Sequence, residues 1–195
     1  MIIKICGVTS AHDAHLCADS GADLIGVVLS DSPRRTSLEA LNGIIDAVGS
    51  GGSVVGVFAA PGDLEQFDAG CQTELDYYQT YFDRSLVTVR QPKRAWIRAK
   101  RVKQNVELSA GSDITLLDFK DFQSDELLSE LRKYYDKITD TTLVAGGLTV
   151  GNISSVLAAV RPLGVDVARG TEKSAGIKDP ELVREFIARI KHAAS

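Results

Sequence analysis

Residues 143–179 read LVAGGLTVGNISSVLAAVRPLGVDVARGTEKSAGIKD, and this stretch decides how the chain folds. Two short apolar runs, residues 143–145 and 164–168, each lead into glycine, and residues 150–160 between them carry a helical pattern. In a parallel α/β barrel, the loops after strands seven and eight and a short extra helix form the usual phosphate site. Glycines there let backbone N–H groups approach a ligand closely. Ordinary caps and turns account for these residues equally well, so the rest of the chain decides between the two interpretations.

Six further strand-like runs precede this stretch, and most of them alternate with helical patterns. The strands are expected at residues 2–6, 24–29, 53–58, 75–79, 94–100 and 113–118. The helices are expected at residues 11–20, 38–48, 64–67, 125–138, 150–160 and 180–193. Eight alternating units predict a closed (β/α)8 barrel, and an open doubly wound sheet is the competing architecture.

The length of the chain limits this barrel. Its 195 residues fall below the ~250 of a usual barrel, so several helices and loops must be short or lost. No linker or long low-complexity segment interrupts the pattern. The sequence therefore predicts a single barrel domain over residues 1–195, with shortened helices and loops.

Composition excludes several classes of partner. The formal net charge is −4 and the densest basic stretch, residues 93–103, is interrupted by apolar residues, so we expect no nucleic-acid partner. No apolar run approaches the roughly 20 residues that cross a bilayer, so we expect no membrane partner. An odd number of cysteines without metal-ligand spacing, and no recognisable secretory signal, predict a reduced, cytoplasmic protein without a metal site.

A thiol and a carboxylate are candidates for chemistry at strand ends, where barrel enzymes carry their catalytic residues. The two-residue period of a strand puts Cys6 on the face of Lys4, and Asp118 on the face of Leu116. If those faces line the barrel, the pair suits proton shuttling, and Lys4 favours the thiolate. Taken alone, Cys6 is more often a small buried core residue, and Asp118 fits a helix cap equally well.

Two arginines follow the second expected strand. Arg34 and Arg35 stand where a bidentate donor grips a substrate carboxylate, although a solvated polar loop explains them equally well. The end of the fourth expected strand is aromatic, with Tyr77, Tyr78, Tyr81 and Phe82. These rings could flank an aromatic substrate, but packing is the favoured interpretation.

Seven short motifs, spread over nearly the whole chain, belong together. They are Lys4-Ile5-Cys6-Gly7-Val8-Thr9, Gly21-Ala22-Asp23, Ser32-Pro33-Arg34, Val55-Gly56-Val57-Phe58, Leu116-Leu117-Asp118, Ala145-Gly146-Gly147-Leu148 and Gly164-Val165-Asp166-Val167. Each is weak alone, but the ordered set resembles the phosphoribosylanthranilate isomerase family of tryptophan biosynthesis. The resemblance implies a (β/α)8 barrel that uses no metal or organic cofactor.

The resemblance also implies a reaction and roles for particular residues. The reaction is an Amadori rearrangement of N-(5′-phosphoribosyl)anthranilate to 1-(2-carboxyphenylamino)-1-deoxyribulose 5-phosphate. By resemblance, Asp118 is the general acid that opens the furanose ring to a Schiff base, and Cys6 is the general base that removes the C2′ proton. Arg34 matches the family arginine that holds the anthranilate carboxylate. The other residues implied in substrate binding are Gln79, Asp166 near the ribose, and, for the phosphate, Gly146, Gly147, Gly170 and Gly176.

The chain departs from the family pattern at three strand ends. Residues 79–82, Gln-Thr-Tyr-Phe, replace the usual Gln-Leu-His-Gly, so only Gln79 is kept. Residues 119–124 lead almost directly into a helix, where the family has a long loop with Gly-Gly-Thr-Gly. Residues 168–172, Ala-Arg-Gly-Thr-Glu, replace the usual Ser-Ser-Gly-Val-Glu. We therefore expect a divergent isomerase that binds a small phosphosugar, as a monomer or a homodimer.

Two other functions compete with this one. A related barrel isomerase of histidine biosynthesis usually has an internal half-barrel repeat and an aspartate in place of Cys6, and this chain shows no such repeat. A non-catalytic phosphosugar-binding barrel would tolerate the short sixth loop. Retention of both Cys6 and Asp118 argues against it, because binding alone requires neither.

Overall fold

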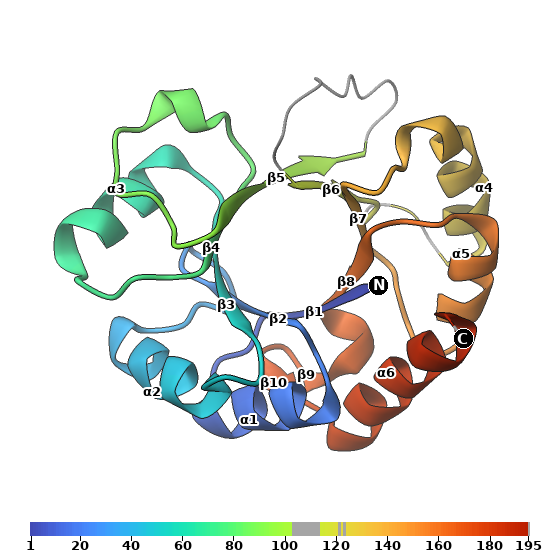
Figure 1. Cartoon of the computed structure of the whole chain (residues 1–195), viewed down its shortest axis with the longest axis horizontal. Helices are drawn as coiled ribbons and strands as arrows, with labels where there is room; N and C mark the ends of the chain where they lie inside the picture. Colours follow the sequence, from blue (N-terminus) through green and yellow to red (C-terminus); the bar gives the residue numbers. More distant parts are fainter. Residues whose placement is uncertain (103–113, 121, 123, 195) are drawn as a thin grey trace.

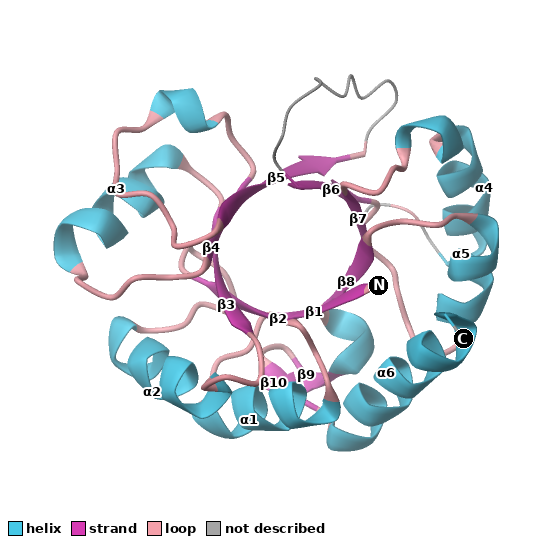
Figure 2. Ribbon diagram, in the orientation of Figure 1, coloured by secondary structure: helices cyan, strands magenta, loops and turns pink. Residues whose placement is uncertain are grey.

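Parallel strands close into a barrel in the computed structural model, which describes residues 1–102, 114–120, 122 and 124–194. Within these residues, each of β1 to β8 pairs in parallel with the next, and β8 pairs with β1 to close the ring. Figures 1 and 2 show the ring of strands at the centre and the helices around its outside. The predicted (β/α)8 barrel is confirmed, and the open doubly wound sheet is excluded.

The strands of the barrel lie close to the ranges that the sequence predicts. They are β1 Ile2–Cys6, β2 Leu24–Val28, β3 Ser53–Phe58, β4 Tyr77–Thr80, β5 Ala95–Arg101, β6 Ile114–Asp118, β7 Thr142–Ala145 and β8 Gly164–Val167. A short antiparallel pair, which the sequence analysis did not anticipate, follows β8 and consists of β9 Glu172–Ser174 and β10 Ile177–Lys178.

The helices cover the outside of this ring. They are α1 Ala11–Ser20, α2 Leu38–Val48, α3 Pro61–Gly70, α4 Ser124–Lys133, α5 Ile153–Ala159 and α6 Pro180–Ala194. The described residues also include three short 3-10 helices, η1 Arg84–Leu86, η2 Tyr135–Lys137 and η3 Arg169–Thr171. No helix in the described ranges is both long and apolar enough to cross a membrane.

Some element bounds differ from those expected. Helix α4 ends at Lys133, and a separate 3-10 turn follows it where a continuous helix to residue 138 was expected. Helix α3 is longer than the expected 64–67, because Pro61 occupies its first turn and the Asp63 carboxylate accepts the N–H of Ala60. Residues 103, 113, 121 and 123, which belong to expected segments, lie outside the described residues.

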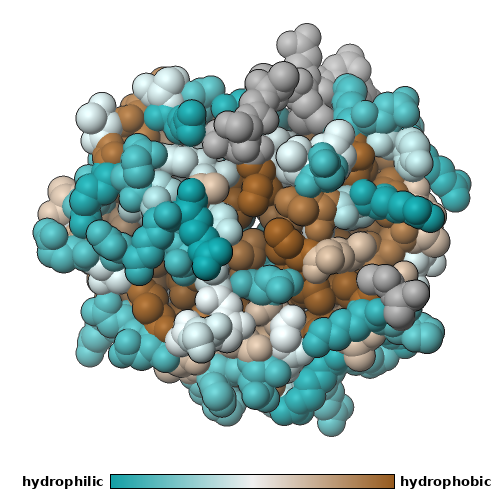
Figure 3. All heavy atoms as spheres, viewed as in Figure 1, coloured by the Kyte–Doolittle hydropathy of each residue, from teal (hydrophilic) through white to brown (hydrophobic). Residues whose placement is uncertain are grey.

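The strand period separates two apolar layers. Leu116 belongs to the cluster inside the barrel, whereas Leu117 packs between the strands and the helices. Cys6 also packs against the interior cluster, whereas Ile5 belongs to the outer layer. Figure 3 shows apolar side chains gathered around the barrel axis and hydrophilic ones over the periphery. Lys4, Cys6 and Asp118 therefore lie on interior faces, as the period predicts.

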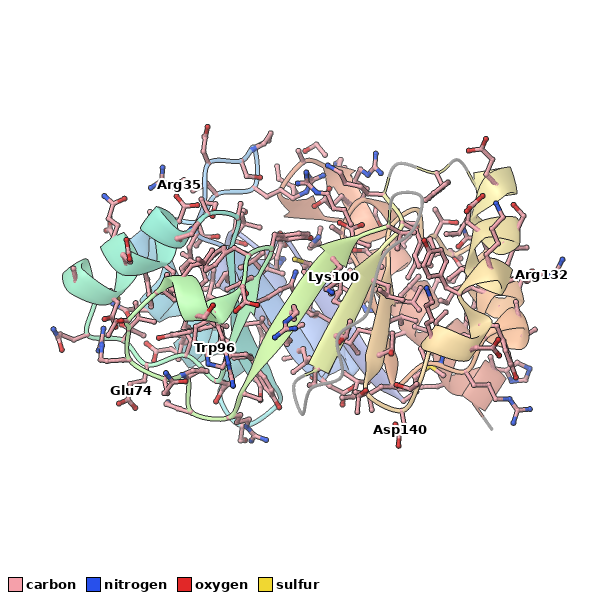
Figure 4. All side chains as sticks on the ribbon, turned by 90° about the horizontal axis from the view of Figure 1, so that it is seen from above. Arg35, Glu74, Trp96, Lys100, Arg132 and Asp140 are labelled. Atoms are coloured by element: carbon pink, nitrogen blue, oxygen red, sulfur yellow. The ribbon has the colours of Figure 1, made fainter. Side chains whose placement is uncertain are left out.

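All eight strands run in one direction, so their C-terminal ends share one end of the barrel. Figure 4 shows Arg35, in the loop after β2, at the opposite end from Glu74 and Asp140, which precede β4 and β7. Side chains at the ends of β1, β4, β6 and β8 are thus brought to one opening, although they are far apart in the sequence.

Candidate active site

A cavity of about 790 Å³ opens at the C-terminal ends of the strands. The predicted polar site residues Cys6, Arg34, Gln79, Asp118 and Asp166 all line it. They come from strands or loops on several sides of the barrel, and only closure of the ring brings them together. The structure thus assembles one site from residues that the sequence assigned separately.

The thiol of Cys6 is held beside a buried ion pair. Lys4, which is fully buried, donates from Nζ to Asp166 Oδ1 at 3.0 Å. Burial opposes the charge of Lys4, but Asp166 and Cys6 outweigh it and raise the pKa of the ammonium. Burial also raises the pKa of the Cys6 thiol, and the Lys4 charge only partly offsets this.

Gly26 on the neighbouring strand β2 makes room for these two groups. A Cβ at this position would lie 2.8 Å from Cys6 Sγ and 3.0 Å from Lys4 Nζ. Both atoms therefore crowd over the bare Cα of Gly26, and they lie close to each other. The site needs glycine here because of space, since its backbone is not in the left-handed region.

Both oxygens of the Asp118 carboxyl group accept a hydrogen bond. Oδ1 accepts the backbone N–H of Lys120 at 3.1 Å, and Oδ2 accepts the hydroxyl of Tyr81 at 3.2 Å. Burial, and then the nearby Asp166 carboxylate, raise the pKa of Asp118, while the two hydrogen bonds act in the opposite direction. Asp118 consequently keeps its proton to a higher pH than a surface aspartate, which suits a general acid.

Arg34 is fixed by a carboxylate that the sequence analysis did not identify. Its Nε and Nη2 donate to the two oxygens of Glu172 at 2.8 and 2.6 Å. Lys178 Nζ donates to the same carboxylate at 3.1 Å. Burial favours the neutral acid, but Arg34 and Lys178 lower the pKa of Glu172, so it stays ionised. This two-point contact, or fork, between Arg34 and Glu172 uses two of the five guanidinium N–H groups, and three remain for a ligand.

The four predicted phosphate-site glycines do not all reach the cavity. Gly146, Gly147 and Gly170 line it. A Cβ on Gly146 would lie 2.3 Å from the backbone N of Lys120, and one on Gly170 would lie 2.1 Å from the carbonyl oxygen of Leu148. These glycines therefore let the loops after β6, β7 and β8 approach one another.

Gly176 lies outside this lining. Its N–H donates to Glu172 Oε1 at 3.4 Å, and its carbonyl accepts the hydroxyl of Thr9 at 2.6 Å. The φ of 81° at Gly176 also permits the turn between β9 and β10. The structure thus places Gly176 behind the Arg34–Glu172 pair, where it supports the position of Glu172.

Gln79 faces the cavity with an unpaired oxygen. The side chain is 1% exposed, and its Oε1 has no hydrogen-bond partner among the described residues. An unpaired buried acceptor costs free energy unless a ligand supplies a donor. Gln79 Oε1 is therefore an acceptor that a donor group of a bound molecule would satisfy.

Tyr81, Arg101 and Glu172 are site residues that the sequence analysis did not assign to the site. The guanidinium of Arg101 lies over the Tyr81 ring, with its carbon 5.3 Å from the ring centre. Strand period two was the available signal for Tyr81, because Tyr77 and Gln79 precede it on the interior face. The signal for Glu172 was its match to the final residue of the family's Ser-Ser-Gly-Val-Glu, although its partner Arg34 lies 138 positions away.

These features define a class of protein: a (β/α)8 barrel whose cavity gathers a thiol, a carboxyl group of raised pKa and a guanidinium, a set suited to acid–base chemistry on a small anionic molecule. In the described part of the chain, no group of three or more potential ligands could hold a metal ion. The partly buried Cys6 thiol and the Asp118 carboxyl of raised pKa are two groups of this site that suit proton exchange with a bound molecule.

Comparison with known proteins identifies the family. The model described as N-(5′-phosphoribosyl)anthranilate (PRA) isomerase matches residues 3–189. A relative from Streptococcus gordonii, named N-(5′-phosphoribosyl)anthranilate isomerase, is 34% identical over 192 residues, 97% of either chain. The chain therefore belongs to the N-(5′-phosphoribosyl)anthranilate isomerase family. The family and the isomerase class predicted from the motifs are confirmed.

Solved structures agree in fold. TrpF from Jonesia denitrificans superposes with a TM-score of 0.84 at 24% identity, covering 100% of this chain and 98% of that one. At this identity the likeness shows the fold alone. A phosphoribosyl anthranilate isomerase in complex with reduced 1-(o-carboxyphenylamino)-1-deoxyribulose 5-phosphate matches with a TM-score of 0.74 at 28% identity, covering 98% and 100%.

Proposed function

We propose that this chain converts N-(5′-phosphoribosyl)anthranilate to 1-(2-carboxyphenylamino)-1-deoxyribulose 5-phosphate in tryptophan biosynthesis. The observation that carries the proposal is the placement of Cys6 and Asp118 on one cavity of a chain that matches the isomerase family over residues 3–189. The solved family member in complex with a reduced form of this product supports the same choice of substrate.

In this mechanism Asp118 acts first, as the general acid. Its proton passes to the furanose ring oxygen while the C1′–O bond breaks and the aniline nitrogen forms a protonated Schiff base with C1′. Burial and the neighbouring Asp166 support this role, because both raise the pKa of Asp118 and so favour the protonated acid.

Cys6 then acts as the general base. Its thiolate removes the C2′ proton, and the electrons flow into the Schiff base to give a neutral enolamine, which tautomerises to the ketose. The Lys4 ammonium beside the sulfur stabilises the thiolate, and Asp166 in turn keeps Lys4 charged. Return of the proton from Cys6 to Asp118 through solvent restores the starting state, so the reaction is an isomerisation without net gain or loss of atoms.

The two anionic ends of the substrate are assigned to different sides of the cavity. Arg34 is proposed to hold the anthranilate carboxylate, because the Glu172 fork fixes the guanidinium and leaves three N–H groups free to donate. The phosphate is proposed to bind the backbone of Gly146, Gly147 and Gly170, beside the exposed Arg169.

The sugar between these ends is assigned to polar side chains of the cavity. Gln79 Oε1 is proposed to accept a hydroxyl or N–H of the substrate, which would satisfy its unpaired oxygen. Asp166 is proposed to lie near the ribose, since it lines the cavity while it pairs with Lys4. These contacts hold the reacting carbons between the thiol and the acid.

We further propose that residues 1–195 form one domain that works in the cytoplasm as a monomer or a homodimer. The three cysteines are all free, which supports a reducing compartment. Sedimentation at several protein concentrations would measure the oligomeric state.

The function is tested by supplying freshly made phosphoribosylanthranilate and following loss of its fluorescence. Cys6→Ala and Asp118→Asn are each expected to abolish the enzyme-dependent loss. Cys17→Ala and Asp46→Asn, which alter a core thiol and an exposed carboxylate of helices α1 and α2, are matched controls expected to stay active. A folded wild-type protein that binds the substrate without accelerating its loss would instead establish a binding barrel.

A further inference from the structure

Tyr81 connects the proposed acid to a cation at the mouth of the cavity. The residue directly follows β4, and its side chain continues the interior face of Tyr77 and Gln79. Its hydroxyl donates to Asp118 Oδ2 at 3.2 Å, while the Arg101 guanidinium lies over its ring at 5.3 Å. Tyr81, Arg101 and Asp118 all line the cavity.

The backbone register explains why these three groups meet. Arg101 and Asp118 are directly paired across β5 and β6, at the ends of both strands. Tyr81 directly follows β4, on the other side of β5, and its ring reaches toward Asp118 beneath the guanidinium. A cation within about 6 Å of a ring centre attracts the ring face, so Arg101 holds the ring in place.

The Asp118 carboxyl has two anchors of different kinds. The Lys120 N–H that bonds Oδ1 belongs to the backbone, two residues further along the chain. The Tyr81 hydroxyl on Oδ2 is the only side-chain anchor among the described residues. The terminal torsion of an aspartate is broad, so a single hydrogen bond leaves the carboxyl plane free to rotate.

We propose that Tyr81 is a positioning residue for Asp118, and that its hydroxyl fixes the carboxyl plane from which the proton reaches the substrate. This inference rests on the proposed function of Asp118 as the acid. Tyr81 acts through Asp118 and needs no contact with the substrate. Burial and the neighbouring carboxylates raise the pKa of Tyr81, so its hydroxyl stays protonated and remains a donor.

The substitution Tyr81→Phe removes the hydroxyl and keeps the ring under Arg101. We expect kcat to fall about tenfold, because a freely rotating acid spends little time in the productive orientation, while KM changes less than about twofold. Tyr77→Phe is the matched control: it removes another interior-facing hydroxyl of β4, one that makes no hydrogen bond to the described residues.

A pH profile separates positioning from packing. The charged or titratable groups around Asp118 are Asp166 on β8, Lys120 after β6, Tyr81 after β4 and Arg101 on β5. The variant Tyr81→Phe leaves the other three groups in place and removes only the hydroxyl that donates to the ionised Asp118 carboxylate. The low-pH limb of kcat/KM, which reports the pKa of Asp118, is therefore expected to move to higher pH. A packing defect would lower the rate equally at every pH.

Titration of ¹³C-labelled aspartate gives a second readout that needs no substrate. The Asp118 carboxyl signal, assigned by its loss in Asp118→Asn, is expected to titrate at higher pH in Tyr81→Phe than in Tyr77→Phe or the wild type. If Tyr81→Phe has the wild-type rate and its Asp118 carboxyl titrates as in the wild type, the positioning role is overturned while the proposed isomerase function stands. A wild-type protein that does not consume the substrate would overturn the proposed function, whatever the titration shows.

Discussion

Gly26→Ala tests whether the thiol must sit where the structure places it. The added Cβ would lie 2.8 Å from Cys6 Sγ, about 0.6 Å short of the 3.4 Å at which ordinary contact begins. It would also lie 3.0 Å from the Cys6 Cα, which the β1–β2 ladder holds in place. The sulfur therefore has to rotate away from its position beside Lys4.

Two effects of measurable size follow from Gly26→Ala. Overpacking a closely filled site costs about 1–3 kcal/mol, which lowers Tm by roughly 2–12 °C in a chain of this length. Displacement of the sulfur by about 0.6 Å is expected to lower kcat about 10- to 100-fold, since misplacements of this order are costly at a reacting centre. Calorimetry and the fluorescence assay measure the two effects separately.

Gly43→Ala is the matched control for this substitution. Gly43 lies within α2, and a Cβ there would meet only the Cβ of Ala11, at the ordinary distance of 3.8 Å. Alanine favours the helix over glycine by about 0.5–1 kcal/mol, so this variant is expected to be slightly more stable and fully active. A Gly26→Ala protein with wild-type kcat would refute the assignment of Cys6 to the reacting centre.

Three further predictions concern charge. Arg34→Lys loses the two-point hydrogen bond to Glu172, so its KM is expected to rise about tenfold. The KM of Arg35→Lys, in the same loop, is expected to equal that of the wild type. Equal KM values for the two variants would contradict the assignment of Arg34 to the substrate carboxylate. The value of kcat/KM is expected to be flat between the pKa of Asp118 and that of Cys6, and to fall on both sides of this range. Between the two pKa values the fraction of enzyme that carries both a protonated Asp118 and a Cys6 thiolate is constant. A steady rise of kcat/KM with pH would contradict this assignment. Lys4→Met leaves Asp166 buried without its partner, so calorimetry should show a loss of about 3–5 kcal/mol.

Local signals explain the parts of the fold that the sequence predicted well. The bounds of α1 and α2 were predicted correctly, because Ser10 and Ser37 cap them and glycines follow their last residues. The strand β3 was also predicted with its observed bounds, since the apolar run of residues 54–58 follows Ser53 directly and the strand is buried on both faces. Each of these signals lies within a few neighbouring residues of the sequence.

The contacts within the site have no such local signal, because they join residues that are far apart in the sequence. Tyr81 and Asp118 are 37 positions apart, and Arg34 and Glu172 are 138 apart. With 26 acidic and 22 basic residues in the chain, charge alone does not select these partners. The shift between neighbouring strands decides which side chains meet at the cavity. The hairpin that carries Glu172 has only three and two residues in its strands, too few for a periodic signal.

Closure of the barrel and assembly of the site are the same event in this chain. Lys4 pairs in register with Asp166 across the seam between β1 and β8, and this pairing sets the charge beside the Cys6 thiol. Lys178, on β10, reaches back to the carbonyl of Cys6 at 2.6 Å while it holds Glu172 beside Arg34. An open barrel would separate both clusters, leaving Lys4 without its counter-charge and Arg34 without its support. The groups proposed for proton transfer and for carboxylate binding therefore become functional only when the last strand has paired with the first.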